Sequence, residues 1–220
     1  MSLTSWLKNP LFKLRLLTGF LWLLIYQALD NALTSFLEKL FRSSDGAPPW
    51  IWAFAVLSVI LNMLAPLFIS FWILTGRSAL IPWKKFELLI IESLRAWGST
   101  FLWGLALIVP GIFKWLSYVF VPFVAVLSKR YQEGEKEALQ YSFQLFRLAW
   151  GKVTLSLIFF YILAPLLVAL FFDGYRKIWE TPLMSLLASS VDYSLLLISL
   201  FVFVKIFVHC LSEVKDEPVF

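Results

Sequence analysis

The chain has 220 residues, of which 60% are hydrophobic and only 15% are charged, and its net charge is +5 at pH 7. This apolar share exceeds that of soluble domains, so the composition indicates an integral membrane protein with no room for a soluble domain. The basic balance favours contact with anionic lipid headgroups. It argues against nucleic acid binding, which needs a solvated basic face with exposed aromatic side chains. The single Cys210 excludes an internal disulfide.

The hydropathy pattern predicts a single all-α domain, a polytopic membrane bundle of about six transmembrane helices. The predicted spans are residues 16–29, 50–74, 86–109, 112–127, 153–172 and 183–210. An amphipathic stretch at 32–41 is expected to continue the first helix. Tryptophans near both ends of the second span are typical of aromatic belts.

Pro110 and Gly111 lie between the third and fourth predicted spans. Proline removes a backbone donor and glycine accepts unusual backbone angles, so the pair is expected to stop one helix and let the next begin at once. The sequence therefore predicts a tight helical hairpin with its break at Pro110 and Gly111.

A charged loop at 129–137 precedes a segment with helical spacing, 137–150. Its expected apolar face consists of Ala138, Leu139, Ser142, Leu145, Phe146 and Ala149. Its polar face consists of Lys136, Gln140, Gln144 and Arg147. The segment is too short and too polar to span, so we expect a cytoplasmic helix in the headgroup layer.

A resemblance rests on these residues: Pro-Gly-Ile at 110–112, a Pro-Phe-Val step at 122–124, a charged loop with a glycine, Glu-Ala-Leu at 137–139 followed by Ser142, and Trp-Gly at 150–151. With them the chain resembles the YciC-like bacterial inner-membrane proteins. It is also similar to the membrane domain that precedes some glycerophosphodiester phosphodiesterases. Members of the family often carry a basic residue just before the serine, where this chain has Gln140 and Tyr141. The resemblance implies architecture more than activity.

The distribution of basic residues predicts the orientation of the bundle. All but five of the 19 Lys and Arg residues fall at the N-terminus, before or in the first turns of the third span, after the fourth span or at the C-terminal end; the exceptions are Lys39, Arg42, Lys114, Arg176 and Lys177. Because positive residues are retained on the cytoplasmic side, both termini are expected to lie in the cytoplasm of a bacterial cell.

Polar residues inside apolar segments are candidates for function, because each needs a partner or water. Asn62, Lys114 and Asp192 are the main ones, and one hypothesis pairs Lys114 with Asp192; the alternative is a shallow, solvated Asp192 with the span beginning at Tyr193. Asn62 is expected to make one interhelical hydrogen bond. Four further residues form two pairs one turn apart: Glu92 with Arg95 is expected at the surface, and Lys205 with His209 is expected to snorkel.

Internal prolines at Pro66, Pro122 and Pro165 leave open an arrangement of two inverted three-helix halves, as in some transporters.

The sequence gives no support for an enzymatic activity. The only histidine is His209, and the sequence holds no zinc pair, nucleophile elbow, phosphate loop or Cys-x-x-Cys motif. No catalytic, metal or cofactor site is therefore predicted.

The expected role is non-catalytic: a scaffold or accessory subunit that binds anionic lipids or another membrane protein. The candidate docking residues are Lys129, Arg130, Gln140, Gln144, Arg147 and Lys152. The alternative is a transporter or permease subunit for a small solute or lipid, which would need a polar path containing Asn62 and Asp192.

Overall fold

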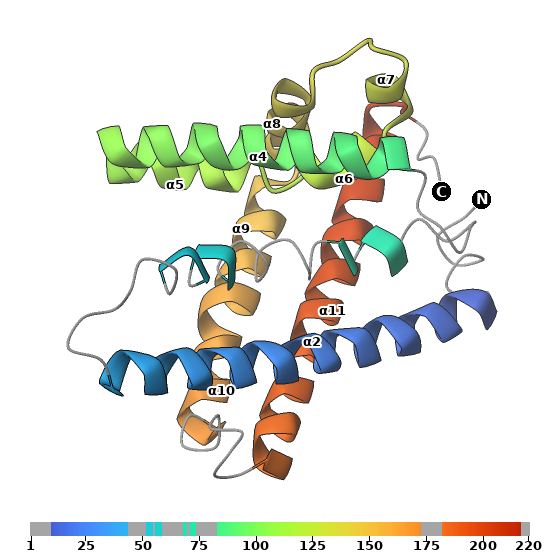
Figure 1. Ribbon diagram of the computed structural model, residues 1–220. Coiled ribbons are helices and arrows are strands. Elements are labelled where there is room, and N and C mark those ends of the chain that lie inside the picture. Colours follow the sequence, from blue (N-terminus) through green and yellow to red (C-terminus); the bar gives the residue numbers. More distant parts are fainter. Residues whose placement is uncertain are drawn as a thin grey trace. The chain divides into compact units, whose positions relative to one another are not determined.

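The computed structural model describes residues 10–43, 52–54, 56–58, 68–69, 71–73, 83–172 and 182–216. The regular structure of these residues is helical throughout, which confirms the predicted all-α class (Figure 1). They group into two compact units. The first unit lies within residues 75–161 and 199–220, and the second unit lies within residues 2–74 and 162–198.

Four segments among the described residues are long and apolar enough to cross a membrane: Leu14–Thr34, Ile108–Leu127, Trp150–Phe171 and Leu186–Glu213. They indicate a membrane protein. Four of the six predicted spans lie largely within these segments: 16–29, 112–127, 153–172 and 183–210. The predicted span at 50–74 lies largely outside the described residues. The one at 86–109 corresponds to a helix that is not among the four.

The second unit contains α2 (Pro10–Ser43), α10 (Ala164–Phe172) and the N-terminal part of α11 (Pro182–Glu213). Helix α2 runs unbroken through 32–41, which confirms the predicted continuation of the first helix. It buries Leu23 completely. At Gly19 an added Cβ would lie 2.7 Å from Cδ1 of Ile73, so glycine lets the segment at 71–73 approach α2 closely.

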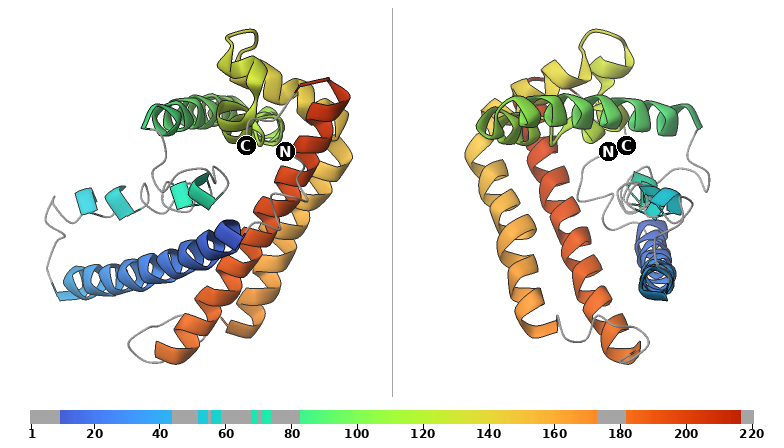
Figure 2. Two further views of the ribbon diagram at one scale, coloured as in Figure 1. Left: turned by 90° about the vertical axis from the view of Figure 1, so that its right-hand side faces the viewer. Right: turned by 60° about the vertical axis from the view of Figure 1, so that its left-hand side comes forward.

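The first unit contains α4 (Trp83–Ala106), α5 (Ile108–Ser117), α6 (Val121–Leu127), α7 (Lys129–Gln132), α8 (Ala138–Leu148), α9 (Trp150–Ile158) and the C-terminal part of α11. Helix α6 forms its core, because every residue of α6 except Pro122 is buried. The rings of Phe120 and Phe123 pack against Phe207 of α11, with centroids 5.6 and 5.7 Å away. Within this unit α4 and α5 lie side by side and run crosswise to α9 and α11 (Figures 1 and 2).

The break between α4 and α5 lies at Leu107, which has an extended backbone, so the predicted break at Pro110 and Gly111 is wrong by three residues. Pro110 instead occupies the first turn of α5, where its missing N–H would have had no helical partner. Gly111 has a different role from the predicted one: a Cβ there would lie 2.5 Å from Cα of Gly104. Glycine at 111 therefore allows the two helix backbones to touch.

The predicted span at 112–127 is not one continuous helix, because a turn at 118–120 separates α5 from α6. The helix from Trp150 also changes character before Pro165, through the π-helical turn η1 (Phe159–Leu163). Proline lacks the N–H that would continue the α-helical ladder, and a widened turn accommodates the gap. Pro66 lies outside the described residues, so the inverted repeat stays a prediction.

Candidate functional site: a polar cap on the first unit

The amphipathic helix predicted at 137–150 is α8, which begins at Ala138 and ends at Leu148. Four members of its predicted apolar face, Ala138, Ser142, Leu145 and Phe146, are buried, as is Ala149 just beyond the helix. Leu139 is only half-buried, and Tyr141, which the prediction left out, is 1% exposed. The exposed side carries Gln140, Gln144 and Arg147, as predicted.

The buried face of α8 packs on protein. The expected place of the helix in the headgroup layer stays a prediction. Its neighbours are α5 and α6. The Ser142 hydroxyl donates a 2.7 Å hydrogen bond to the carbonyl oxygen of Ser117, where α5 ends. The ring of Phe113 meets those of Phe143 and Phe146 edge-on. Periodicity alone cannot tell which medium covers an apolar face, and here a neighbouring helix does.

A carboxylate from the C-terminal end of the chain ties this region together. Asp216 is only 6% exposed, and its Oδ2 accepts hydrogen bonds from the hydroxyls of Ser128 and Tyr141, both at 2.8 Å. The Ser128 hydroxyl also accepts from the backbone N–H of Tyr131 and thereby caps α7. One carboxylate therefore fixes the start of α7, the middle of α8 and the end of α11. We refer to residues 128–149 together with 209–216 as the polar cap.

The backbone at the end of α11 positions the Asp216 carboxylate. Lys215 has a left-handed backbone with φ of 54°, the conformation that glycine usually supplies after a helix. The N–H of Asp216 bonds to the carbonyl of Leu211, and the N–H of Lys215 bonds to that of Ser212. This is the hydrogen-bond pattern of a Schellman cap, formed with lysine at the position that favours glycine. The side-chain bonds of Asp216 help to hold that less favourable backbone.

Glu92 and Arg95 form the local ion pair predicted from their spacing, with Nη1 of Arg95 at 2.9 and 3.1 Å from the two carboxylate oxygens. The pair is only partly at the surface, because Arg95 is exposed whereas Glu92 is 5% exposed. The Tyr131 hydroxyl donates a 3.1 Å hydrogen bond to the same carboxylate and so joins α7 to α4. Burial, followed by the nearby Glu92 charge, raises the pKa of Tyr131 to about 12.

The raised Tyr131 pKa sets an expected pH dependence. The folded state keeps the tyrosine proton more tightly than the unfolded state, whose pKa is near 10, so the contribution of Tyr131 to stability is fully present below pH 10 and is lost as the pH rises from 10 to about 12. Tyr141 contributes in the same direction, because burial and the Asp216 bond raise its pKa as well. Tyr131→Phe should make the decline shallower in chemical denaturation followed from pH 8 to 12. An unchanged pH profile in this variant would contradict the assignment.

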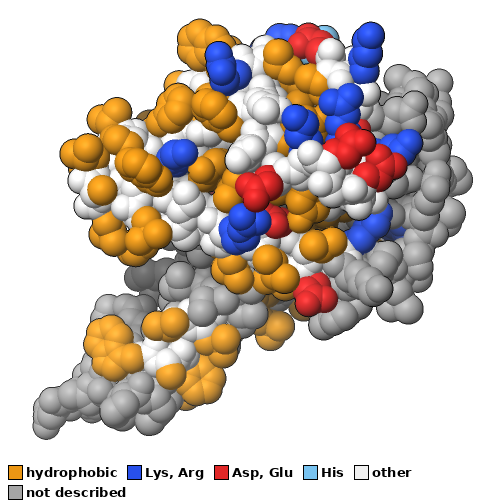
Figure 3. Space-filling view, turned by 90° about the horizontal axis from the view of Figure 1, so that it is seen from above, with side chains coloured by type: hydrophobic (Ala, Val, Ile, Leu, Met, Phe, Trp, Pro, Cys, Tyr) orange, Lys and Arg blue, Asp and Glu red, His pale blue; other side chains and the backbone are white. Residues whose placement is uncertain are grey.

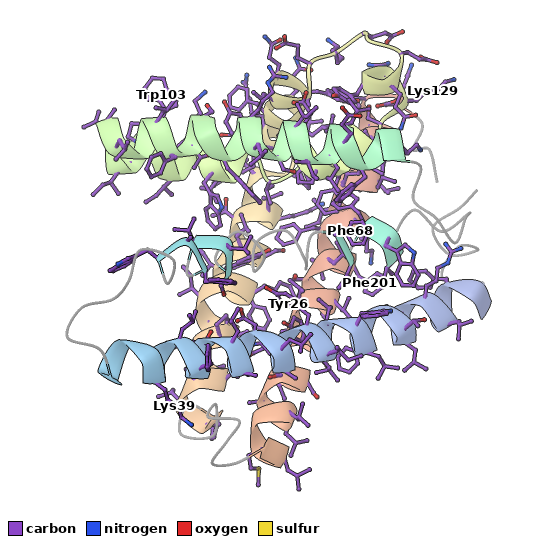
Figure 4. The ribbon with its side chains drawn as sticks, viewed as in Figure 1. Tyr26, Lys39, Phe68, Trp103, Lys129 and Phe201 are labelled. Carbon is purple, nitrogen blue, oxygen red and sulfur yellow. The ribbon has the colours of Figure 1, made fainter. Side chains whose placement is uncertain are left out.

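The outer surface of the polar cap is charged with both signs. Lys129 and Glu133, and Arg130 and Glu135, form loose ion pairs at 3.9 Å, and Arg130 also donates to the carbonyl oxygen of Lys215. The predicted docking residues on α8, Gln140, Gln144 and Arg147, are exposed, and so is Lys152 on α9. Charged side chains gather toward this end of the first unit in Figure 3, and Figure 4 places Lys129 there.

The predicted intramembrane residues Asn62, Lys114 and Asp192 lie in different parts of the chain. Asn62 lies outside the described residues. Lys114 donates to the Tyr118 hydroxyl at 3.2 Å and lies over the rings of Trp103 and Tyr118. Lys114 and Asp192 belong to different units, so their pairing stays a prediction. Helix α11 begins at Pro182, before Asp192. The depth of Asp192 in the membrane stays a prediction.

Two further polar features accompany the candidate spans. Lys205 is exposed, and Nε2 of His209 lies 3.4 Å from a carboxylate oxygen of Glu213. In the second unit, Tyr193 of α11 donates a 2.6 Å hydrogen bond to Oε1 of Gln27 on α2, whose amide nitrogen donates to Asn31. One turn away, Ser58 donates to Asp30 at 2.7 Å. The sequence analysis did not suggest this polar network.

An open groove of about 260 Å³ lies between α4 and α5. It is lined by Thr100, Gly104, Ile108, Gly111, Ile112 and Trp115, so its wall is almost wholly apolar. Across the described ranges no cluster of His, Cys, Asp and Glu side chains has the arrangement that a metal ion would need. The groove therefore has few polar groups that could recognise a ligand.

Comparison with protein-family models, with curated proteins and with solved structures gives no match. The resemblance to the YciC-like proteins stays a prediction that rests on the residues quoted for it.

Proposed function

We propose that this chain is a non-catalytic, multi-pass membrane protein that acts as an accessory subunit and binds a partner protein through the exposed side of α8. This docking face consists of Gln140, Gln144 and Arg147. The observation that carries the proposal is the burial of the opposite side of α8 against α5 and α6. A helix whose apolar side is already covered presents its polar side from a fixed position, which lowers the entropic cost of binding.

The proposal places the protein in a bacterial cytoplasmic membrane, with the polar cap and both termini in the cytoplasm, as expected for a YciC-like protein. Anionic lipid headgroups are the second ligand we propose, at Lys129 and Arg130 of the cap and at Lys152 of α9. Each well-placed cation contributes about 1 kcal/mol to such contacts. The network of Tyr193, Gln27 and Asn31 supports transport of a small solute or lipid as the alternative function, because polar groups in membrane helices often line a path.

Reversing the charge of the docking face tests the proposal. We expect Arg147→Glu to reduce recovery of a bound protein at least tenfold in native mass spectrometry of material extracted gently from its own membrane, since like charges across an interface cost several kcal/mol. Lys129→Glu should weaken binding less, because Lys129 is already near Glu133. Lys39→Glu is the matched control, with the same charge change at an exposed position of α2 in the second unit.

Three results are distinguishable in this experiment. Loss of a defined protein partner in Arg147→Glu, with binding retained in Lys39→Glu, supports an accessory subunit. Equal loss in both variants indicates a general charge effect and contradicts a specific docking face. Recovery of the chain with only lipid or a small molecule, unchanged in every variant, would favour transport.

A further inference from the structure

The end of the α4 and α5 pair farthest from the polar cap is unusually apolar. Within residues 101–112, here called the tip, exposure reaches 75% at Ile108 and 77% at Val109. The other exposed large side chains of the tip are Phe101, Leu102, Trp103, Leu105, Leu107 and Ile112. In Figure 3 hydrophobic side chains gather at this end, and in Figure 4 Trp103 lies toward it, away from Lys129. A continuous apolar surface of this kind marks contact with a membrane or another apolar body.

The tip includes the first residues of the apolar segment Ile108–Leu127, but that segment is not one continuous helix. Helix α5 has ten residues and is about 15 Å long, half of the hydrocarbon thickness of about 30 Å. Beyond the turn at 118–120 the chain continues as α6, which is buried in protein. Helix α4 is long enough to span, but Glu92 and Arg95 form an ion pair near its middle. The short length of α5, the burial of α6 and the ion pair in α4 therefore argue against a membrane crossing by these helices.

The orientation of α4 and α5 also argues against a membrane crossing. In the first unit α9 and the end of α11 belong to two of the candidate spans, and α4 and α5 run crosswise to both (Figures 1 and 2). Helices that cross a bilayer stand near its normal. If α9 and α11 do so, α4 and α5 lie along the membrane surface, at the level where α9 begins and α11 ends.

The side chains around the tip are those of an interfacial segment. Trp103 and Trp115 are exposed, and Lys114 extends over the rings of Trp103 and Tyr118 with its Nζ 5.8 and 5.4 Å from their centroids. Tryptophan, tyrosine and lysine are enriched where hydrocarbon meets headgroups. Close approach of Gly111 to Gly104 holds the two helix backbones together at the tip.

We propose that α4 and α5 form a monotopic hairpin whose tip is embedded in the headgroup and upper acyl region of the leaflet on the side of the polar cap. The hairpin does not cross the membrane. Its occupant is the lipid surface, because Trp115 of α5 packs edge-on against Tyr161, which belongs to the candidate span Trp150–Phe171, with ring centroids 6.2 Å apart. The predicted spans at 86–109 and 112–127 are then replaced by one in-plane element, and both termini stay on one side.

A fluorophore at residue 109 tests the inference. Val109→Cys in a Cys210→Ala background is labelled with bimane, and the full-length protein is placed with one orientation in vesicles of phosphatidylcholine and phosphatidylglycerol. Quenching is measured with lipids brominated near the headgroup or near the chain end, and with iodide on either side. Glu135→Cys in the cap loop and Leu183→Cys at the opposite end of α11 are the matched controls for sidedness, and both residues are exposed.

We expect headgroup-level bromine to quench the Val109 label at least twofold more than chain-end bromine. Iodide should reach the label only from the side that also quenches the Glu135 label. Iodide access from the Leu183 side would mean that the hairpin crosses the membrane and would overturn the inference. Strongest quenching by chain-end bromine, or no quenching by either lipid, would place the tip at mid-membrane or against protein, and either result would also overturn it.

Discussion

Asp216→Ala is expected to lower the free energy of unfolding by about 2–4 kcal/mol, because it leaves two buried hydroxyls without their charged acceptor. The two hydroxyls belong to Ser128, which is fully buried, and Tyr141, which is 1% exposed. Loss of the carboxylate also frees the end of α11 from α7 and α8. Chemical denaturation in detergent should show the loss, and limited proteolysis should cut the C-terminal end sooner.

Two variants separate this effect from general damage at the C-terminal end. Asp216→Asn keeps an acceptor oxygen and should cost only about 1 kcal/mol. Lys215→Gly relieves a left-handed backbone at the neighbouring position and should be neutral or slightly stabilising. If Asp216→Ala proves as stable as the natural chain, the carboxylate does not hold the polar cap together.

Gly111→Leu should have the second large effect, because even the first carbon of the new side chain lies 2.5 Å from Cα of Gly104 and 2.8 Å from its backbone nitrogen. Backbone atoms cannot rotate away as a side chain can, so α4 and α5 must separate. Overpacking of this kind costs about 1–3 kcal/mol and more when the backbone is the obstacle. The distance between spin labels at exposed positions Leu94 and Trp115 should increase and broaden.

Gly104→Ala is the matched control on the other side of the same contact. A Cβ at Gly104 meets no atom within 4 Å, so this change should leave the helix pair intact and can stabilise α4 by up to about 1 kcal/mol. A large loss in Gly104→Ala, or none in Gly111→Leu, would show that the close glycine contact does not govern the packing.

The helices were largely predictable from the sequence because apolar periodicity and length report on them directly. The stretch at 32–41 continues α2, and the polar side of α8 is the predicted one. The boundary between α4 and α5 was harder to predict from the sequence. Proline at 110 reads as a helix stop, yet proline is equally suited to the first turn of a helix, and a single sequence does not distinguish the two roles.

The polar cap was only partly predictable, since its decisive contacts join residues far apart in the chain. Tyr141 falls at the spacing of the buried face, three residues after Ala138 and four before Leu145, so its burial could have been inferred. Ser128 stands where an N-cap is common, just before a short helix. Asp216 gave no signal, because a carboxylate beyond the end of an apolar helix is usually solvated. Its partners are 88 and 75 residues away.

The sequence also did not indicate whether protein or lipid covers an apolar helix face. Hydropathy predicts that a face avoids water, but lipid and protein satisfy it equally. The apolar side of α8 is covered by α5 and α6, whereas that of the tip at 101–112 is exposed. Where tertiary packing decides, the pattern of one segment does not contain the answer.

Photo-crosslinking in the native membrane from residue 144 tests the proposed docking face most directly. Gln144 is exposed at the centre of that face, and benzoylphenylalanine in its place should yield one discrete adduct with another protein, reduced at least tenfold by Arg147→Glu. The same reagent at the buried position Leu145 should give no such adduct. Crosslinks to lipid alone from residue 144, or a protein adduct that Arg147→Glu leaves unchanged, would contradict an accessory subunit that binds its partner through α8.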